Sequence, residues 1–195
     1  MSKASDTKET ILQAAFNMAS KIRISAVTIG ELAKKVHMSK SGLFAHFRSK
    51  ENLQVEILKY TGVRFKEAVF DPSLKAPKGV ARLKMIVQNW IQWLEQELPG
   101  GCPVLNATAE FSNEKGPVRD ITVQMHKDLL GFLNKSVSIC VQTGEFNSST
   151  DVEMVSFQLY SLVQGYQRYR DVVGDKKAKS QLMKTIDQLI QSHRN

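Results

Sequence analysis

Apolar residues recur every three or four positions along almost the whole chain, and this spacing constrains the fold more than any other feature. Such a period belongs to one face of an α-helix, whereas a half-buried strand alternates strictly. Val137–Val141 resembles a strand when taken alone, but it lies within a longer helical pattern. Prolines, glycines and hydroxyl residues divide the pattern into about nine helices. The sequence therefore predicts an all-α protein.

The composition is that of a folded globular protein. The chain has 195 residues, of which 42% are hydrophobic and 24% are charged. Its two cysteines, Cys102 and Cys140, are too few for a disulfide framework, so a reducing compartment is expected. We find no apolar run of membrane-spanning length and no apolar core of a signal peptide near the first residue. We therefore expect a cytoplasmic protein that does not bind a membrane.

Positive charge is concentrated at the N-terminal end. The whole chain carries a net charge of +8, and residues 1–50 hold nine Lys or Arg against three Asp or Glu. Six of the eight excess charges thus lie in the first quarter of the sequence. This asymmetry favours a polyanionic partner, nucleic acid before membrane, although a solvated basic face would look the same.

Residues 28–50 have the local signals of two short helices joined by a tight turn, followed by a longer helix. Thr28 and Glu31 have the spacing of a capping box, and Ser39 and Ser49 are suitable N-caps for the next two helices. The helix after Ser39 would turn Leu43 and Phe47 inward. It would then present to solvent Lys40, Ser41, Gly42, Phe44 and His46. This arrangement predicts a helix-turn-helix whose second helix enters the DNA major groove, with Lys40 able to reach guanine.

The segment Thr28–Glu51 resembles the signature of the tetracycline-repressor-type (TetR) family of transcriptional regulators, T-x-x-x-I-A-x-x-A-G-V-S-x-G-x-L-Y-x-H-F-x-S-K-E. The resemblance implies that Lys40, Ser41, Gly42, Phe44 and His46 face double-stranded operator DNA, and that Thr28 and Lys50 hold phosphates. It also implies a homodimer formed by the last two helices and a small-molecule cavity in the C-terminal domain. We therefore predict a DNA-binding domain at residues 1–50 and a regulatory domain at residues 51–195.

Four positions depart from the family pattern. His37 stands where the family has its turn glycine, at a position expected to need positive φ. Ser41 replaces the next glycine, and Gly42 follows it directly. Phe44 replaces a tyrosine, and Ala45 replaces a frequent aromatic residue. These changes remove polar and aromatic contacts, so we expect Lys40 and the charge of the N-terminal arm to carry more of the affinity.

Candidate ligand-binding residues lie on the longer helices that follow the turn-rich segment at residues 71–79. They are mostly aromatic or polarisable: Trp90, Trp93, Cys102, Phe111, Met125, Leu129, Phe132, Phe157 and Tyr160. A stripe of this kind also suits an ordinary core. Cys102 precedes Pro103 at an expected helix start, where the helix dipole favours a reactive thiolate, but an inert thiol fits equally.

Two apolar stripes near the C-terminal end suggest a dimer interface. The residues involved are Val155, Leu159, Leu162 and Tyr166 on one helix and Leu182, Ile186 and Leu189 on the next. Two such helices from each of two chains would form a four-helix interface, and Gly165 would permit close approach. Packing within one chain is the alternative.

The sequence contains no motif that supports catalysis. We find no phosphate-binding Gly-Lys-Ser/Thr loop, no zinc-ligand spacing and no nucleophile motif, so we expect no cofactor, no metal and no enzyme activity. The leading hypothesis is a homodimeric repressor released from a palindromic operator by a small molecule. A DNA-binding regulator without a small-molecule effector is the first alternative, and a helical small-molecule-binding protein or enzyme is the second.

Overall fold

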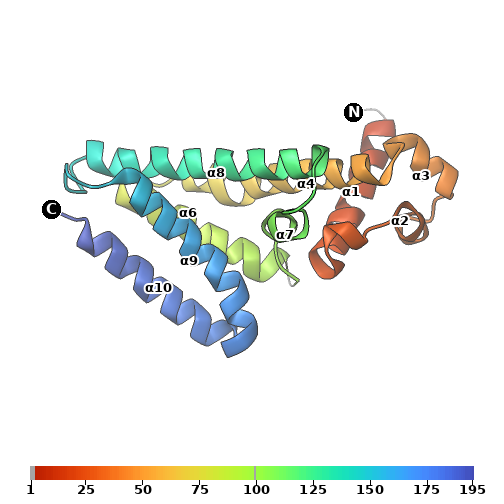
Figure 1. The fold of residues 1–195 in the computed structure, drawn as a ribbon. Helices are drawn as coiled ribbons and strands as arrows, with labels where there is room; N and C mark the ends of the chain where they lie inside the picture. Colours follow the sequence, from red (N-terminus) through yellow and green to blue (C-terminus); the bar gives the residue numbers. More distant parts are fainter. Residues whose placement is uncertain (1–2, 99) are drawn as a thin grey trace. The chain divides into compact units, whose positions relative to one another are not determined.

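The computed structural model describes residues 3–98 and 100–195, and within them every regular element is helical. Pro99, which the sequence predicts to end a helix, lies outside the described residues. The segments in chain order are α1 (Lys3–Ile22), α2 (Ile29–Lys35), α3 (Lys40–Phe47), α4 (Lys50–Phe65), α5 (Asp71–Ser73), α6 (Val80–Gln92), α7 (Pro103–Glu110), α8 (Pro117–Gln142), α9 (Val152–Val173) and α10 (Asp175–Ser192) (Figure 1).

These elements confirm the prediction of an all-α protein. Because α5 is a single turn, nine helices in the described ranges exceed one turn. Val137–Val141 lies inside α8, so the helical interpretation of that segment is correct. Strand-like pairing in the described chain is limited to an isolated bridge between Phe146 and Arg194. No described helix is long and apolar enough to cross a membrane.

Three short segments connect or extend these helices. A 3-10 turn, η1 (Ile24–Ala26), follows α1. Two π-helical segments, η2 (Lys66–Phe70) and η3 (Trp93–Glu97), continue α4 and α6 directly. Apolar residues at helical spacing along α6, η3 and the position directly after η3 are buried on one face of this continuous stretch: Val80, Leu83, Val87, Trp90, Leu94 and Leu98.

The chain divides into two compact units. The first unit comprises Met1–Lys66 and Leu94–His126, and the second comprises Glu67–Trp93 and Lys127–Asn195. Each unit therefore draws on two separate stretches of sequence. The predicted functional division at residue 50 does not coincide with this division of the backbone and stays a prediction.

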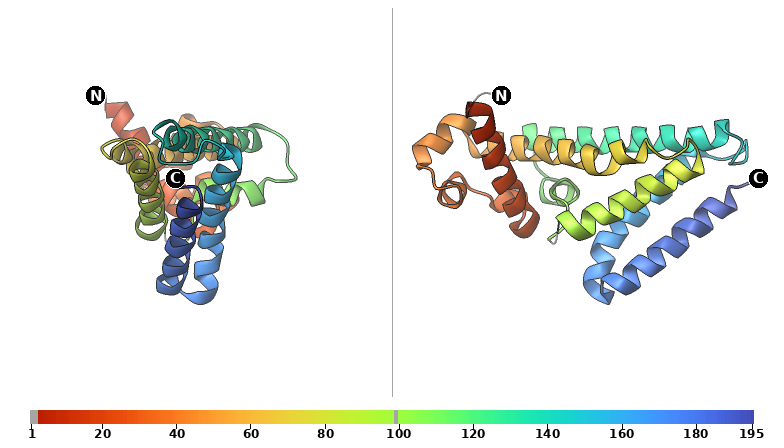
Figure 2. Two further views of the ribbon diagram at one scale, coloured as in Figure 1. Left: turned by 90° about the vertical axis from the view of Figure 1, so that its left-hand side faces the viewer. Right: turned by 180° about the vertical axis from the view of Figure 1, so that it is seen from behind.

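In the first unit, α1 packs against α4 and α2 packs against α3 (Figures 1 and 2). Its core is fully closed around Ile11, Ala15, Leu32, Leu43 and Phe47, each at most 1% exposed. α7 contacts α4 and η1, and brings Ala107 and Phe111 into the same core. This core fixes the orientation of α2 and α3, which carry the predicted DNA-facing residues.

In the second unit, α9 and α10 pack side by side as an antiparallel pair (Figures 1 and 2). Phe70 stacks on Phe132 with ring centroids 3.9 Å apart. Lys84 of α6 forms an ion pair with Asp187 of α10, with Nζ and Oδ1 2.6 Å apart. Glu145 accepts a hydrogen bond from the Val80 N–H at 2.9 Å and so satisfies one of the free donors at the start of α6.

Candidate nucleic-acid interface

The turn between α2 and α3 is a Schellman motif with His37 in the left-handed conformation. The Met38 N–H donates to the Ala33 carbonyl at 2.9 Å, and the His37 N–H donates to the Lys34 carbonyl at 3.4 Å. His37 has φ of 54°, which confirms the positive φ predicted from the family's glycine. Histidine adopts this conformation more readily than β-branched residues do, so the turn keeps its geometry without glycine.

Side-chain caps begin both helices and the helix that follows, as predicted. Thr28 Oγ1 accepts from the Glu31 N–H at 3.2 Å, Ser39 Oγ from the Gly42 N–H at 3.0 Å, and Ser49 Oγ from the Asn52 N–H at 3.0 Å. Glu31 completes the Thr28 capping box differently from the expected pattern. Its carboxylate accepts a hydrogen bond from the Thr28 hydroxyl at 2.9 Å.

The recognition helix α3 buries one face and exposes the other. Leu43 and Phe47 are fully buried, which confirms their predicted inward orientation. The remaining predicted residues of α3 lie on its accessible side: Lys40, Ser41 and Phe44 are exposed, and Gly42 and His46 are half-buried. Phe44 is 53% exposed, so a large part of this apolar side chain is left in contact with solvent. Such a surface suits contact with base edges or thymine methyl groups.

Lys40 lies across the start of α2. A Cβ placed on Gly30 would come within 3.2 Å of Lys40 Cε and 3.7 Å of its Nζ. The absence of a side chain at position 30 therefore leaves room for the Lys40 chain. Lys50 is exposed in the first turn of α4, and Thr28 is half-buried at the N-cap of α2. The structure thus brings Lys40 next to Gly30, a relation that their separation of ten positions does not reveal.

The basic side chains of this region are largely without acidic partners. Among the cations of residues 7–50, Lys8 alone has a carboxylate within 4.0 Å in the described structure. The unpaired group consists of Lys21, Arg23, Lys34, Lys35, Lys40, Arg48 and Lys50, all of them exposed. Unpaired surface cations keep their full positive field and so attract a polyanion.

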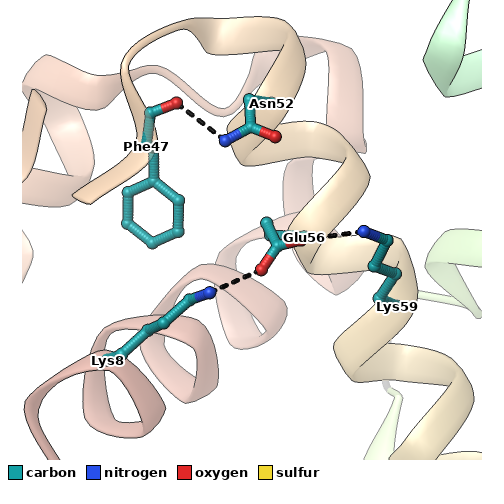
Figure 3. Close-up of polar contacts among 5 residues, drawn as sticks. All are labelled: Lys8, Phe47, Asn52, Glu56 and Lys59. Atoms are coloured by element: carbon teal, nitrogen blue, oxygen red, sulfur yellow. Dashed lines mark hydrogen bonds and ion pairs between the residues drawn. The ribbon is translucent and has the colours of Figure 1, made fainter. Parts of the chain in front are cut away.

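Polar contacts that the sequence pattern does not predict join the end of α3 to α4, and α4 to α1. The Asn52 side chain donates to the Phe47 carbonyl at 2.9 Å, tying the end of α3 to α4 (Figure 3). Glu56 accepts from Lys8 of α1 at 2.7 Å and from Lys59 at 3.1 Å (Figure 3). The Lys8 contact lowers the pKa of Glu56, although partial burial acts in the opposite direction. The Glu56–Lys59 pair has a helical spacing that sequence alone could have suggested.

The candidate ligand-binding residues fall in both units. Cys102, Phe111 and Met125 belong to the first unit, and Trp90, Trp93, Leu129, Phe132, Phe157 and Tyr160 belong to the second. Trp90, Trp93, Cys102 and Phe111 are buried, whereas Met125, Leu129, Phe132 and Tyr160 are half-buried. Phe157 is 59% exposed on α9. Phe111 lies in the buried core of the first unit and Met125 packs against that core, so ordinary core packing accounts for their apolar character.

The two cysteines are buried and reduced. Cys102 occupies the predicted N-cap of α7, but its side chain makes no capping hydrogen bond. Burial raises the pKa of the Cys140 thiol to about 12, so this second cysteine stays protonated at neutral pH. A sensor role for Cys102 stays a prediction. No group of three or more His, Cys, Asp or Glu side chains in the described part of the chain could hold a metal ion.

An apolar groove of about 690 Å³ runs between α9 and α10. Four predicted dimer residues line it: Leu162, Tyr166, Leu182 and Leu189. Phe157 and Gly165 line it too. The other three predicted residues, Val155, Leu159 and Ile186, are at most 1% exposed within the single chain and form part of its own core. Helical spacing identified the apolar positions but did not separate the two faces on which they lie.

A short exposed helix set on a capped support helix defines the class of helix-turn-helix DNA-binding proteins. Comparison with known families agrees with this class. Residues 11–57 match the family model described as bacterial regulatory proteins, tetR family, and residues 79–186 match the tetracyclin repressor-like C-terminal domain. The chain belongs to the tetR family of bacterial transcriptional regulators.

Individual relatives are distant in sequence but similar in fold. The HTH-type transcriptional regulator QacR of Staphylococcus aureus is 30% identical over 120 residues, which cover 62% of this chain and 61% of that protein. A TetR-family regulator from Cytophaga hutchinsonii superposes with a TM-score of 0.84 at 18% identity, covering 100% of this chain and 98% of the other. AibR, solved with isovaleryl coenzyme A and operator DNA, has a TM-score of 0.70 at 21% identity, covering 89% of this chain and 95% of the other.

Proposed function

We propose that this chain is a homodimeric transcriptional repressor that binds a palindromic operator and leaves it when a small molecule binds the regulatory part of the chain. The observation that carries the proposal is the exposed face of α3, with Lys40, Ser41 and Phe44 open to solvent on a helix whose other face is fully buried. A helix presented in this way fits the major groove, and the unpaired cations on α2, at the end of α3 and at the start of α4 suit the phosphates on either side. Thr28 and Lys50 would contact phosphates, and Gly42 and His46 would complete the surface that faces the bases.

The α9–α10 groove supports the homodimer. Most of its lining residues are apolar or aromatic, and two of them, Phe157 and Tyr169, have exposed side chains. A contiguous apolar surface of this kind is typical of a protein–protein interface. A second copy of the same pair of helices would cover it in a symmetric four-helix arrangement, in which each copy contributes the same surface. Two α3 helices could then read half-sites about one helical turn apart, roughly 34 Å.

The hydrogen bonds around α4 support a mechanism for release. Asn52 ties α4 to the end of α3, and Glu56 ties it to α1 through Lys8. Tyr60 adds a second tie to α1, donating to Gln13 at 2.7 Å. A displacement of α4 and its continuation η2 would therefore carry the recognition helix with it. If a ligand weakens operator binding by such a displacement, operator DNA must weaken ligand binding by the same factor, commonly 5–150-fold.

We infer the class of effector from the candidate ligand-binding side chains of the second unit. Trp90, Trp93, Phe132 and Tyr160 are apolar or aromatic side chains of the second unit, which suits a largely apolar small molecule. Burial raises the pKa of Tyr160, although a side-chain hydrogen bond with Gln164 acts in the opposite direction, so its phenol stays neutral. AibR, whose fold is similar, was solved with an acyl coenzyme A and its operator. We assign the chain no catalytic role and place its action in the cytoplasm, where bacterial operators lie.

Two measurements test the proposal. Duplexes recovered by the purified chain from a random-sequence pool should converge on a two-fold symmetric site, bound by two chains per duplex. Compounds that raise the Tm of the chain should lower its affinity for that site. Binding without sequence preference would contradict the assignment as an operator-binding regulator. A selected operator with no stabilising compound in a broad screen would favour a regulator without a small-molecule effector.

A further inference from the structure

Positive φ angles divide the chain into two regions with different residue types. In the described residues after position 50, every residue in the left-handed region is a glycine: Gly79, Gly101, Gly116, Gly144 and Gly174. Among residues 3–50, the three residues with positive φ are Arg23, His37 and Arg48. Glycine adopts such angles without a steric penalty, whereas a residue with a Cβ does not. Backbone conformation therefore does not explain why a basic residue occupies such a turn, and its side chain must be considered.

Arg48 occupies the most constrained of these turns near the recognition helix. With φ of 63° and ψ of −31°, it lies close to the γ-turn of positive φ, a rare and strained conformation. The turn is closed by a hydrogen bond from the Ser49 N–H to the Phe47 carbonyl at 2.7 Å. The same carbonyl accepts from Asn52 (Figure 3). The Arg48 N–H donates to the Phe44 carbonyl at 2.7 Å. Several hydrogen bonds thus hold the backbone in a conformation that suits glycine better than arginine.

The side chain of Arg48 is nevertheless free to bind an anion. It is exposed, and no carboxylate of the described side chains lies within ion-pair distance of it. Its position directly follows α3 and precedes Ser49 and Lys50, the start of α4. The guanidinium therefore extends from a fixed point at the end of the helix that would enter the major groove. Arginine is well suited to phosphate because its donors form a planar fork.

We propose that Arg48 contacts a backbone phosphate of the operator, and that this contact accounts for an arginine at a turn that favours glycine. The inference rests on the proposed operator binding and adds to it a residue that neither the sequence pattern nor the family signature singles out. Arg48 would set the register of α3 on the duplex without reading a base, as phosphate contacts do.

Arg23 provides a matched control on another part of the same unit. It is also an exposed arginine with positive φ, at 77°, and it has no carboxylate partner among the described side chains. Its surroundings, however, face α7 and the turn before it. The Ser25 N–H donates to Glu110 of α7 at 2.9 Å, and a Cβ on Gly100 would collide with the Ser20 carbonyl. Arg23→Gly thus removes the same charge and relieves the same kind of backbone strain away from α3.

The experiment measures salt dependence of binding to a duplex selected by the wild-type chain from a random-sequence pool. Arg48→Gly should reduce the steepness of log K against log[salt] by about 0.9. If the variant and the wild type bind equally at 1 M salt, the variant should then bind about eightfold more weakly than the wild type at 0.1 M salt. Arg23→Gly should leave the slope unchanged, and Arg48→Lys should retain it because the charge remains. The Tm of both glycine variants should be unchanged or higher, which excludes misfolding as the cause.

Each result supports or overturns the inference. Equal slopes for Arg48→Gly and the wild type would overturn it, as would equal losses in the Arg48→Gly and Arg23→Gly variants. In both cases the wild type would still bind its selected duplex, so the proposed function would stand. Absence of salt-dependent DNA binding by the wild type itself would overturn the proposed function, and this inference with it.

Discussion

The α2–α3 surface and the α9–α10 groove are both left open by the folded chain, but their chemistry is opposite. The first presents cations without acidic partners among the described side chains, and the second presents apolar side chains that no described helix covers. Exposed cations are well solvated by water and attract anions, whereas burial of an apolar groove against a complementary protein surface lowers the free energy of association. The difference indicates that each surface suits its own kind of partner: the unpaired cations suit a polyanion, and the apolar groove suits another protein surface.

The largest effect is expected at the apolar surface. Phe157→Glu places a charge in the α9–α10 groove, and because Phe157 is 59% exposed the single chain should still fold. The dimer should dissociate, and operator affinity should fall by about 100-fold or more because two linked half-site contacts become separate events. Analytical ultracentrifugation and operator titration measure both changes.

Met85→Glu is the matched control for this variant. Met85 is a 37% exposed apolar residue on α6 and does not line the groove. It should leave the dimer and the operator affinity intact. If the Phe157→Glu protein remained dimeric, the comparison between a charged and an apolar binding surface would fail.

The next effect concerns base preference at the cationic surface. Lys40→Ala should relax sequence preference at one base pair of each half-site, by about 1–3 kcal/mol. Gly30→Ala should act through the same lysine, because its Cβ would lie 3.2 Å from Lys40 Cε and displace the flexible chain. Alanine is also the better helix former, so this variant should be more stable by about 0.5–1 kcal/mol while its base preference changes.

A binding selection on randomised duplexes compares the two variants. Both should change preference at the same base pair of each half-site. Lys50→Ala serves as the control, since loss of a phosphate contact should weaken all sequences similarly. Uniform weakening by Lys40→Ala would assign Lys40 to the phosphates instead.

A smaller effect is expected inside the first unit, away from both surfaces. His126 is buried, and its Nε2 lies 2.6 Å from Thr108 Oγ1 and 3.3 Å from the Val104 carbonyl. Burial lowers the pKa of His126, while the bond to Val104 acts in the opposite direction. The histidine is thus neutral when folded, and the wild type should lose stability as the pH falls below its unfolded pKa of about 6.5.

His126→Gln removes this pH dependence. At pH 8 the variant should be less stable by about 1–2 kcal/mol because a buried hydrogen bond is disturbed. The difference in stability between wild type and variant should narrow toward pH 5, because the wild type alone must remove a proton from the histidine in order to fold. Thermal unfolding across this range measures it. A constant gap would show that the histidine titrates alike in both states.

The smallest effect is expected at the ion pairs that Glu56 forms with Lys8 and Lys59. Glu56→Gln should cost about 0.5 kcal/mol at pH 7, since both partners are partly solvent-exposed. The Lys8 ion pair lowers the pKa of Glu56, so its contribution is present above the unfolded pKa and is lost as the pH falls through the lower folded value. The stabilities of wild type and variant should therefore converge at acid pH, below the folded pKa of Glu56. Operator affinity should fall only slightly, which would confine this contact to positioning α4.

Much of the recognition region could be predicted from the sequence because its signals are local. Thr28, Ser39 and Ser49 cap helices through N–H groups three residues away, and the positive φ of His37 belongs to a Schellman motif closed by hydrogen bonds over three and five residues. Interactions over so few residues depend little on the rest of the fold. Leu43 and Phe47 were assigned to the buried face for the same reason, since helical spacing alone decides which side chains share a face.

Other features depended on neighbours that are distant in sequence. Helical spacing marked Val155, Leu159 and Ile186 as apolar, but packing placed them in the core of the chain and left Phe157 in the open groove. Glu56 meets Lys8 across 48 positions, and no local pattern signals that pairing.

The sequence by itself thus determined the helices, their caps and the motif that reads DNA, because these arise from contacts within a few residues. Only the tertiary structure decided which apolar face is covered and where the Lys40 chain lies. A period tells which residues share a face of a helix, whereas the partner of that face is set by how the helices pack.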